Sequence, residues 1–309
     1  YIGEWSSDVC SSDLRIYWDK TLVPDQLEWT LDVLKARKLR QMIAQAGYPG
    51  VAADLDEEII AAVLPALEAK ARRSATEAQA ERDLLAARTR ARKTFFNASE
   101  GIRGTPVETY LESRGIRLDR LPALPPAFRY LANAEYWMEP ERPRFPALVT
   151  AMVDGNGKLG ACHWTFLKPD GSGKADVEKA KLMFPSTTGL VIRLANGASG
   201  FSPEQAAEKK TAGLCGLLEG IEDGLSLAQE RHDLRIWAAG SLPGLLTVPD
   251  HAAVSGWLAF QDNDWGKPQA KALFDRAMKR LKTTRKPVQT VSIPGDWGKD
   301  INDAIRNEH

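Results

Sequence analysis

The sequence lacks several features that would assign a protein to a class at once. Its three cysteines include no C-x-x-C pair, which argues against a disulfide framework, and no zinc site is expected. No run approaches the roughly 18 apolar residues that a membrane helix needs. No signal-peptide pattern occurs either, so we expect a cytoplasmic protein with no membrane partner. There is no P-loop, so ATP-driven motor activity is not expected from this chain.

The chain also lacks an excess of charge of either sign. Its 41 Lys and Arg residues are balanced by 41 Asp and Glu residues among 309. This balance argues against a generically basic nucleic-acid coat protein, but it is compatible with an enzyme whose basic groove is offset by acidic metal ligands. With 43% hydrophobic and 27% charged residues, the composition is that of a globular protein of one large or two ordinary domains.

The N-terminal part of the chain divides into two segments. The chain begins with Tyr1 rather than Met, so we expect it to be part of a longer reading frame. Residues 1–14 contain WSSDVCSSDL, which looks like translated sequencing adapter, and we predict that they are an artefact. Residues 15–100 are predicted to form a helical region or connector. It would hold one helix at about 24–47 and one or two long charged helices at about 56–97.

Residues 101–210 are predicted to form a small antiparallel β-rich subdomain. T-P-V-E at 105–108 is a capping box that starts a short helix. D-G-N-G at 154–157 is a hairpin turn between two strands. Trp164 and Phe166 on the second strand could stack on bases, but alternating aromatic residues on a strand are more typical of a core.

Residues 211–309 alternate short apolar strands with helices. We predict strands at 214–218, 235–239, 257–260 and 288–293, and helices at 221–231, 268–281 and 301–307. This alternation is typical of a parallel sheet covered by helices. The predicted fold class is therefore α/β, with a parallel sheet at the C-terminus preceded by the β-rich and helical regions.

Acidic residues stand at three of the predicted strand ends. Glu219 follows the first strand, Asp262 and Asp264 follow the third, and Asp300 follows the fourth. Ligands of open parallel sheets bind beyond these ends, and converging carboxylates repel each other unless a cation neutralises them. Mg²⁺ or Mn²⁺ is the expected occupant, and such a site suits phosphoryl transfer. Gly220 would let a phosphate approach the backbone closely.

Each of these motifs is weak by itself, because a D-x-D sequence is equally typical of an Asx turn. Their ordered combination resembles the Toprim domain shared by bacterial-type primases, type IA and II topoisomerases and some nucleases. The matching motifs are L-E-G-I-E-D-G-L-S at 218–226 and D-N-D at 262–264. The resemblance implies that Glu219 is a general acid/base or metal-proximal carboxylate, and that Asp262 and Asp264 are Mg²⁺ ligands. Trp265 directly after D-N-D departs from the usual pattern.

Further motifs narrow the resemblance to the primases of phages and plasmids. G-T-P-V-E-T-Y-L at 104–111 looks like the entry to their catalytic core, and G-K-D-I-N-D at 298–303 is similar to their third acidic element, which would add Asp300 to the metal site. The resemblance covers about residues 80–307. It implies a Mg²⁺-dependent DNA primase that makes short RNA primers on single-stranded DNA from ribonucleoside triphosphates. A replicative helicase would be a plausible partner.

Several basic residues could serve such a site. We predict that Lys174, Lys181, Arg193 and Lys299 hold template backbone or nucleotide. The alternative is that they lie on solvated loops and contribute only to solubility.

Two other functions stay open at this point. One is a Toprim-type endonuclease that cleaves phosphodiesters with the same carboxylates. The other is a non-catalytic DNA-binding module that recruits a helicase. A topoisomerase is less expected, because no candidate tyrosine stands in a suitable extra domain.

Overall fold

The computed structural model describes residues 37, 38, 40, 41, 57–263 and 267–307. The chain divides into two units, residues 1–83 and residues 84–309. In the first unit, the residues described at 37–41 are helical. The rest of the helix predicted at 24–47 lies outside the described residues, as does the predicted artefact at 1–14.

A single long helix connects the N-terminal sequence to the sheets. Helix α3, Glu57–Asn97, continues through Pro65, so the second of the two predicted arrangements, a pair of helices, does not occur. Its last residues belong to the second unit. There Ala91 and Phe95 are buried, and the guanidinium of Arg92 donates to the carbonyl of Leu159 at 2.9 Å. The C-terminal end of α3 is therefore packed against the β-rich part.

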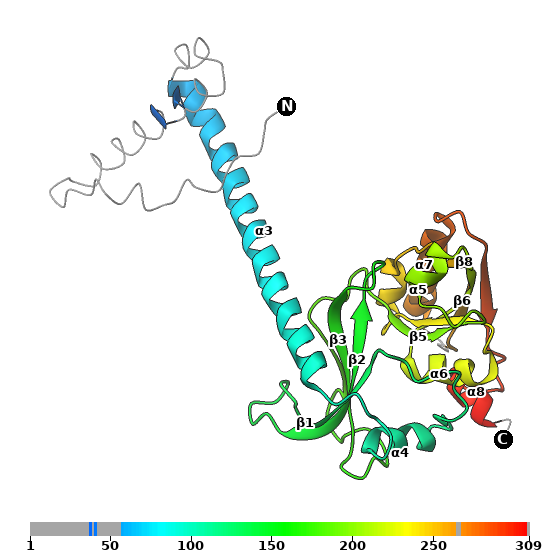
Figure 1. Ribbon diagram of the computed structural model, residues 1–309. Helices are drawn as coiled ribbons and strands as arrows, with labels where there is room; N and C mark the ends of the chain where they lie inside the picture. Colours follow the sequence, from blue (N-terminus) through cyan, green and yellow to red (C-terminus); the bar gives the residue numbers. More distant parts are fainter. Residues whose placement is uncertain (1–36, 39, 42–56, 264–266, 308–309) are drawn as a thin grey trace. The chain divides into compact units, whose positions relative to one another are not determined.

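The second unit opens with a short helix and an antiparallel sheet (Figure 1). Helix α4, Pro106–Ser113, begins at the predicted proline, and Thr105 caps it by accepting from the Val107 N–H at 3.2 Å. The sheet has the order β1-β2-β3-β4, and all its neighbouring strands are antiparallel. Its strands are β1 (Phe128–Glu135), β2 (Arg144–Val153), β3 (Leu159–Phe166) and β4 (Lys181–Phe184). The predicted hairpin thus connects β2 to β3.

The second sheet confirms the predicted α/β fold. Its order is β5-β7-β6-β8-β9, and β7, β6, β8 and β9 run parallel. The strands are β5 (Ile192–Asn196), β6 (Gly213–Leu218), β7 (Arg235–Ala238), β8 (Val254–Gln261) and β9 (Val288–Ser292). The connecting helices are α5 (Pro203–Glu208), α6 (Ile221–Glu230), the 3₁₀ helix η2 (Pro243–Thr247), α7 (Pro268–Lys282) and α8 (Ile301–Asn307).

One strand differs from the sequence-based expectation. Residues 192–196 were expected to belong to the β-rich part at 101–210, but they form β5, the antiparallel edge of the second sheet beside β7. The two sheets meet just before it, where the backbones of Val153 and Val191 exchange hydrogen bonds of 2.8 and 2.9 Å. A short strand carries no mark of its partner in its own sequence, because tertiary context decides which edge it joins.

Helices cover both faces of the second sheet, and the strand alternation decides which side chain faces which helix. Leu218, Ile236 and Ala238 pack with α6 in a core shared with the first sheet. Their neighbours Leu217 and Trp237 point to the other face and pack with α7 in a second core. Figure 1 shows α6 and α7 on these opposite faces.

The aromatic residues of β3, which could either stack on bases or pack in the core, lie in the core. Trp164 and Phe166 are buried, so they are core residues rather than stacking surfaces for bases. His163 is buried as well, and burial together with the charge of Lys181 lowers its pKa to about 4. Among the described residues, no helix carries an apolar stretch long enough to cross a membrane.

Candidate active site at the carboxyl edge of the parallel sheet

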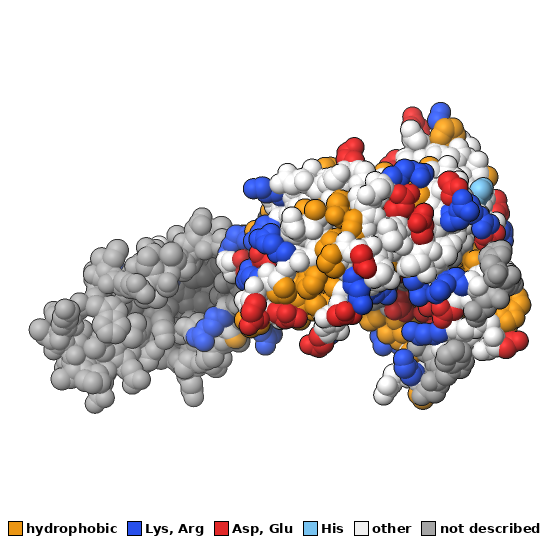
Figure 2. All heavy atoms as spheres, turned by 90° about the horizontal axis from the view of Figure 1, so that it is seen from below, with side chains coloured by type: hydrophobic (Ala, Val, Ile, Leu, Met, Phe, Trp, Pro, Cys, Tyr) orange, Lys and Arg blue, Asp and Glu red, His pale blue; other side chains and the backbone are white. Residues whose placement is uncertain are grey.

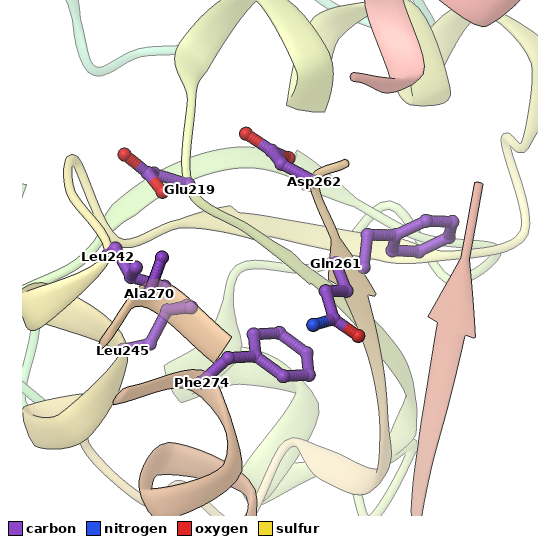
Figure 3. A pocket seen from close by; sticks show the side chains of 8 residues that line it. Glu219, Leu242, Leu245, Gln261, Asp262, Ala270 and Phe274 are labelled. Atoms are coloured by element: carbon purple, nitrogen blue, oxygen red, sulfur yellow. The ribbon is translucent and has the colours of Figure 1, made fainter. Parts of the chain in front are cut away.

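Two of the predicted acidic residues lie side by side at the ends of neighbouring strands. β6 and β8 are paired in parallel with Leu217 opposite Ala259, so Glu219 lies level with the residue that precedes Asp262. Glu219 and Asp262 line the same small pocket, together with Phe274 of α7. Figure 3 shows both carboxylates turned to the same side, away from the ring of Phe274. The strand-end pattern in the sequence therefore brings these two side chains together.

The loop after β8 is tied to the loop before α8. The Asn263 backbone N–H donates to the carbonyl of Lys299 at 2.7 Å, and its side-chain amide donates to the carbonyl of Gly298 at 2.8 Å. These contacts bring the segment that carries Asp300 next to the segment that carries Asp262. Asp264 lies outside the described residues, so its predicted role as a metal ligand stays a prediction.

A further carboxylate, which the sequence reasoning did not select, belongs to this group. Asp223 lies in the first turn of α6 and is 8% exposed. Burial, then the charges of Asp300 and Asp262, raises its pKa to about 8. Asp300 and Asp262 are therefore both within electrostatic reach of Asp223. The signal in the sequence was its spacing, since Asp223 follows Glu219 by one helical turn at the same strand end.

Helix α8 holds Asp223 in place through a buried asparagine. The backbone N–H of Asn302 donates to Oδ1 of Asp223 at 3.2 Å. The Asn302 side-chain amide donates to Oγ of Ser226 and to the carbonyl of Arg114, both at 2.8 Å. Asn302 itself is fully buried. The D-I-N-D motif therefore supports the acidic edge through its asparagine as well as through Asp300.

The side chain of Asp223 occupies the space that a side chain at Gly220 would fill. A Cβ at Gly220 would lie 2.3 Å from Oδ2 of Asp223, which is closer than any stable contact. The expected approach of a phosphate to this glycine stays a prediction; the structure shows that the glycine admits the side chain of Asp223.

We therefore expect Gly220→Ala to displace Asp223 and to reduce metal-dependent activity by about 10²-fold, the loss typical of a misplacement of about 1 Å. The backbone φ at Gly220 is −95°, which alanine also adopts, so the fold should survive. Activity at saturating Mg²⁺ and the melting temperature would both be measured. Gly213→Ala on the same β6 strand is the control, because a Cβ there meets nothing within 4 Å. Equal activity in the two variants would contradict the prediction.

Two lysines contact Glu222, the residue that precedes Asp223 in α6. The carboxylate of Glu222 contacts Nζ of Lys181 at 2.8 Å and Nζ of Lys174 at 3.6 Å. The two lysine side chains are 36% and 41% exposed, whereas that of Glu222 is 7% exposed. Two of the predicted phosphate-binding residues are thus brought together beside the first turn of α6. Figure 2 shows acidic and basic side chains lying next to one another on one face of the molecule.

The other two predicted basic residues differ from these lysines. The guanidinium of Arg193 contacts Glu204 at 2.6 Å and lies over the ring of Trp237. Its side chain is 14% exposed and lines a separate, mostly apolar cavity. Lys299 contributes its backbone carbonyl to the loop contact with Asn263. A nucleic-acid role for either side chain stays a prediction, and Arg193 is left out of the proposed site.

The donor set fits a hard divalent cation. Among the described residues, no three His, Cys, Asp or Glu side chains are grouped closely enough to hold a metal ion by themselves. Mg²⁺, however, is usually held by one or two carboxylates, with waters and substrate phosphates as the other ligands. The like-charge repulsion that raises the pKa of Asp223 is what such an ion would relieve.

Comparisons with known proteins agree with this geometry in the C-terminal part. Residues 215–309 match the family model of the Toprim domain. Residues 86–194 match DUF7146 and residues 2–71 match DUF7700, which are both domains of unknown function. No curated protein matches the chain.

Solved structures of primases are similar to the chain at low identity. A DNA primase domain from Pseudomonas aeruginosa is 14% identical, with a TM-score of 0.43, over 72% of this chain and 75% of that one. The DnaG primase catalytic domain bound to single-stranded DNA is also 14% identical, with a TM-score of 0.44, over 74% and 76%. The primase fragment of the bacteriophage T7 primase-helicase protein is 13% identical, with a TM-score of 0.41, over 68% and 79%.

The family match begins in β6 and includes every strand end that carries a candidate carboxylate. Glu219 follows β6 and Asp262 follows β8, and both lie within the matched residues. Residues 215–309 of this chain are therefore a Toprim domain.

Proposed function

We propose that this protein is a DNA primase-type nucleotidyltransferase that joins ribonucleotides on single-stranded DNA. The observation that carries the proposal is the shared pocket of Glu219 and Asp262, at the ends of adjacent parallel strands. Asp223 faces the same edge from α6. A Toprim domain with acidic groups on one side and exposed lysines on the other suits a reaction between a hydroxyl group and a triphosphate.

Each acidic residue has a proposed role in this reaction. Asp262, with Asp264 and Asp300, would hold Mg²⁺ or Mn²⁺, and Asp223 would complete the group. When bound, the ion would orient the attacking oxygen and offset the charge that builds on the phosphate. Glu219 would assist the removal of the proton from the attacking 3′-hydroxyl.

The basic residues would bind the substrates. Lys174 and Lys181 have partly exposed side chains beside α6, where they could contact the phosphates of a ribonucleoside triphosphate or of the template. The sequence contains no P-loop, and unwinding of the template duplex would be supplied by a helicase.

The test is incorporation of labelled ribonucleotides on single-stranded DNA with Mg²⁺ or Mn²⁺, beside the double variant Asp262→Ala, Asp264→Ala. Short RNA products that disappear in the variant would support the proposal. The DNA strand carries its own label, so cleavage without RNA synthesis would identify a nuclease instead. If neither product forms while the folded protein still binds DNA, the chain is a non-catalytic module and the proposal is wrong.

A further inference from the structure

A buried carboxylate joins the Toprim domain to the part of the chain that precedes it. Glu222 lies on α6, next to Asp223, and is 5% exposed. Its Oε1 accepts a hydrogen bond of 2.6 Å from the hydroxyl of Tyr110 on α4, and its Oε2 accepts one of 2.8 Å from Lys181 on β4. Lys174 adds an ion pair at 3.6 Å. All three partners belong to the segment that matches DUF7146.

The charge state of this cluster follows from its contacts. Burial alone would raise the pKa of Glu222, but the charges of Lys181 and Lys174 and the hydrogen bonds outweigh burial and hold this pKa well below its usual range. Burial, together with the carboxylate of Glu222, raises the pKa of Tyr110 far above its usual value. The hydroxyl of Tyr110 and the ammonium groups of Lys181 and Lys174 thus all converge on one buried carboxylate, while the side chains of the two lysines stay 36% and 41% exposed.

Two lysines this close to each other would repel one another without the carboxylate. Burial and the charge of Lys181 lower the pKa of Lys174, whereas the charge of Glu222 raises it. Removing the anion would leave the ammonium groups free to move apart. It would also lower the pKa of Lys174 further, because the charge of Glu222 favours the protonated form.

We propose that Glu222 is a positioning residue, which holds Lys174 and Lys181 together as a two-ammonium binding site for the phosphate groups of the substrate, and that Tyr110 fixes Glu222. This inference rests on the proposed function, because it names how the lysines of that site are held. The proposal also gives the segment that matches DUF7146 a role. This segment would supply the lysines of the site, and the Toprim domain would supply its carboxylates.

The experiment measures binding of inorganic triphosphate to the whole chain by calorimetry from pH 6 to pH 10, without divalent ions. Binding then needs no turnover and no metal site, so failure of primer synthesis leaves the result interpretable. In Glu222→Gln we expect the alkaline limb, where affinity falls as lysine loses its proton, to move to lower pH by about one unit. Lys174→Met and Lys181→Met should each weaken binding by about tenfold at neutral pH.

Two further variants separate positioning from folding. Glu230→Gln removes a carboxylate from the same helix, where it pairs with Arg120 at 2.8 Å, and should leave the alkaline limb unchanged. Tyr110→Phe removes the hydrogen bond that fixes Glu222 but keeps its charge, so the limb should stay in place while affinity falls severalfold.

The groups that face Lys174 are Lys181 of β4, Glu222 of α6 and Arg114 at the end of α4. His163 on β3 is close enough for both lysines to affect its pKa, but burial keeps it neutral over this pH range. An alkaline limb that is identical in Glu222→Gln and the wild type would overturn the proposal. So would equal shifts of the limb in Glu222→Gln and Tyr110→Phe, because that result would indicate a purely structural role.

Discussion

Replacing Asp262 by asparagine is expected to reduce ribonucleotide incorporation by about 10²- to 10³-fold, and replacing Glu219 by glutamine should have an effect of similar size. Both substitutions keep the size of the side chain, so the pocket that they line should keep its shape. What they remove is charge at the edge where the metal and the attacking hydroxyl would meet. The assay is RNA synthesis on single-stranded DNA at saturating Mg²⁺.

The two substitutions should differ in their dependence on the metal. Loss of a metal ligand at Asp262 should raise the Mg²⁺ concentration needed for half-maximal activity, whereas loss of the proposed base at Glu219 should mainly lower the maximal rate. Asp275→Asn is the matched control. Asp275 is an exposed residue of α7 that pairs with Lys271, one turn away, and its loss should change activity less than about twofold. Full activity in Asp262→Asn would exclude this edge as the catalytic site.

Replacing Asp223 by asparagine is expected to stabilise the protein in the absence of divalent ions and to remove most of the stabilisation that Mg²⁺ provides. The pKa of Asp223 is raised from its ordinary value of 3.8 to about 8, by burial and by the nearby charges of Asp300 and Asp262. A carboxyl group whose pKa is raised in the folded state binds its proton more tightly there than in the unfolded chain. Its contribution to stability is therefore lost as the pH rises from about 4 to about 8.

The size of the effect follows from the linkage between proton binding and folding. One pKa unit corresponds to about 1.4 kcal/mol. Allowing for relaxation of the charged site, we expect Asp223→Asn to raise the free energy of unfolding at pH 8 by roughly 2 kcal/mol. The melting temperature should then rise by about 4 to 8 °C. Near pH 4 the two proteins should melt alike, because the aspartate is protonated in the folded wild type.

The same melting experiment is repeated with Mg²⁺. A cation at the acidic edge replaces the proton of Asp223, so the wild type should gain stability at pH 8 when Mg²⁺ is added. A ligand at about 100 times its dissociation constant adds about 2.7 kcal/mol. Thermal melts with EDTA and with Mg²⁺, at pH 4, 6 and 8, test both parts. A variant that melts below the wild type at pH 8 in EDTA would contradict the predicted repulsion.

Part of the site could be predicted from the sequence because strand ends are local features. A short apolar run marks β6 or β8, and the acidic residue that follows the strand lies at the carboxyl edge of the parallel sheet. Glu219 and Asp262 were found in this way, and the structure places both in one pocket. Asp223 was missed because its importance depends on distance to Asp262 and Asp300, which are 39 and 77 positions away along the chain.

The sequence also could not distinguish the roles of the predicted basic residues. Lys174, Lys181 and Arg193 all resemble solvent-exposed cations in the sequence. The first two share Glu222 and keep their side chains partly exposed, whereas Arg193 is packed against Trp237 and paired with Glu204. The charges of these three residues did not reveal their partners in the sequence, because Glu222 and Glu204 come from other elements of the fold.

The sequence by itself determined the order of the strands and α-helices in the C-terminal part, the proline that starts α4, and the carboxylates at the strand ends. These depend on hydrophobic periodicity and on residues only a few positions apart. Only the tertiary structure decided that β5 joins the second sheet, that Asp223 lies in the acidic group, and that Glu222 holds two lysines of the preceding segment. The reason is physical: packing sets the distances between charges from separate elements, and those distances decide which charges repel and which pair.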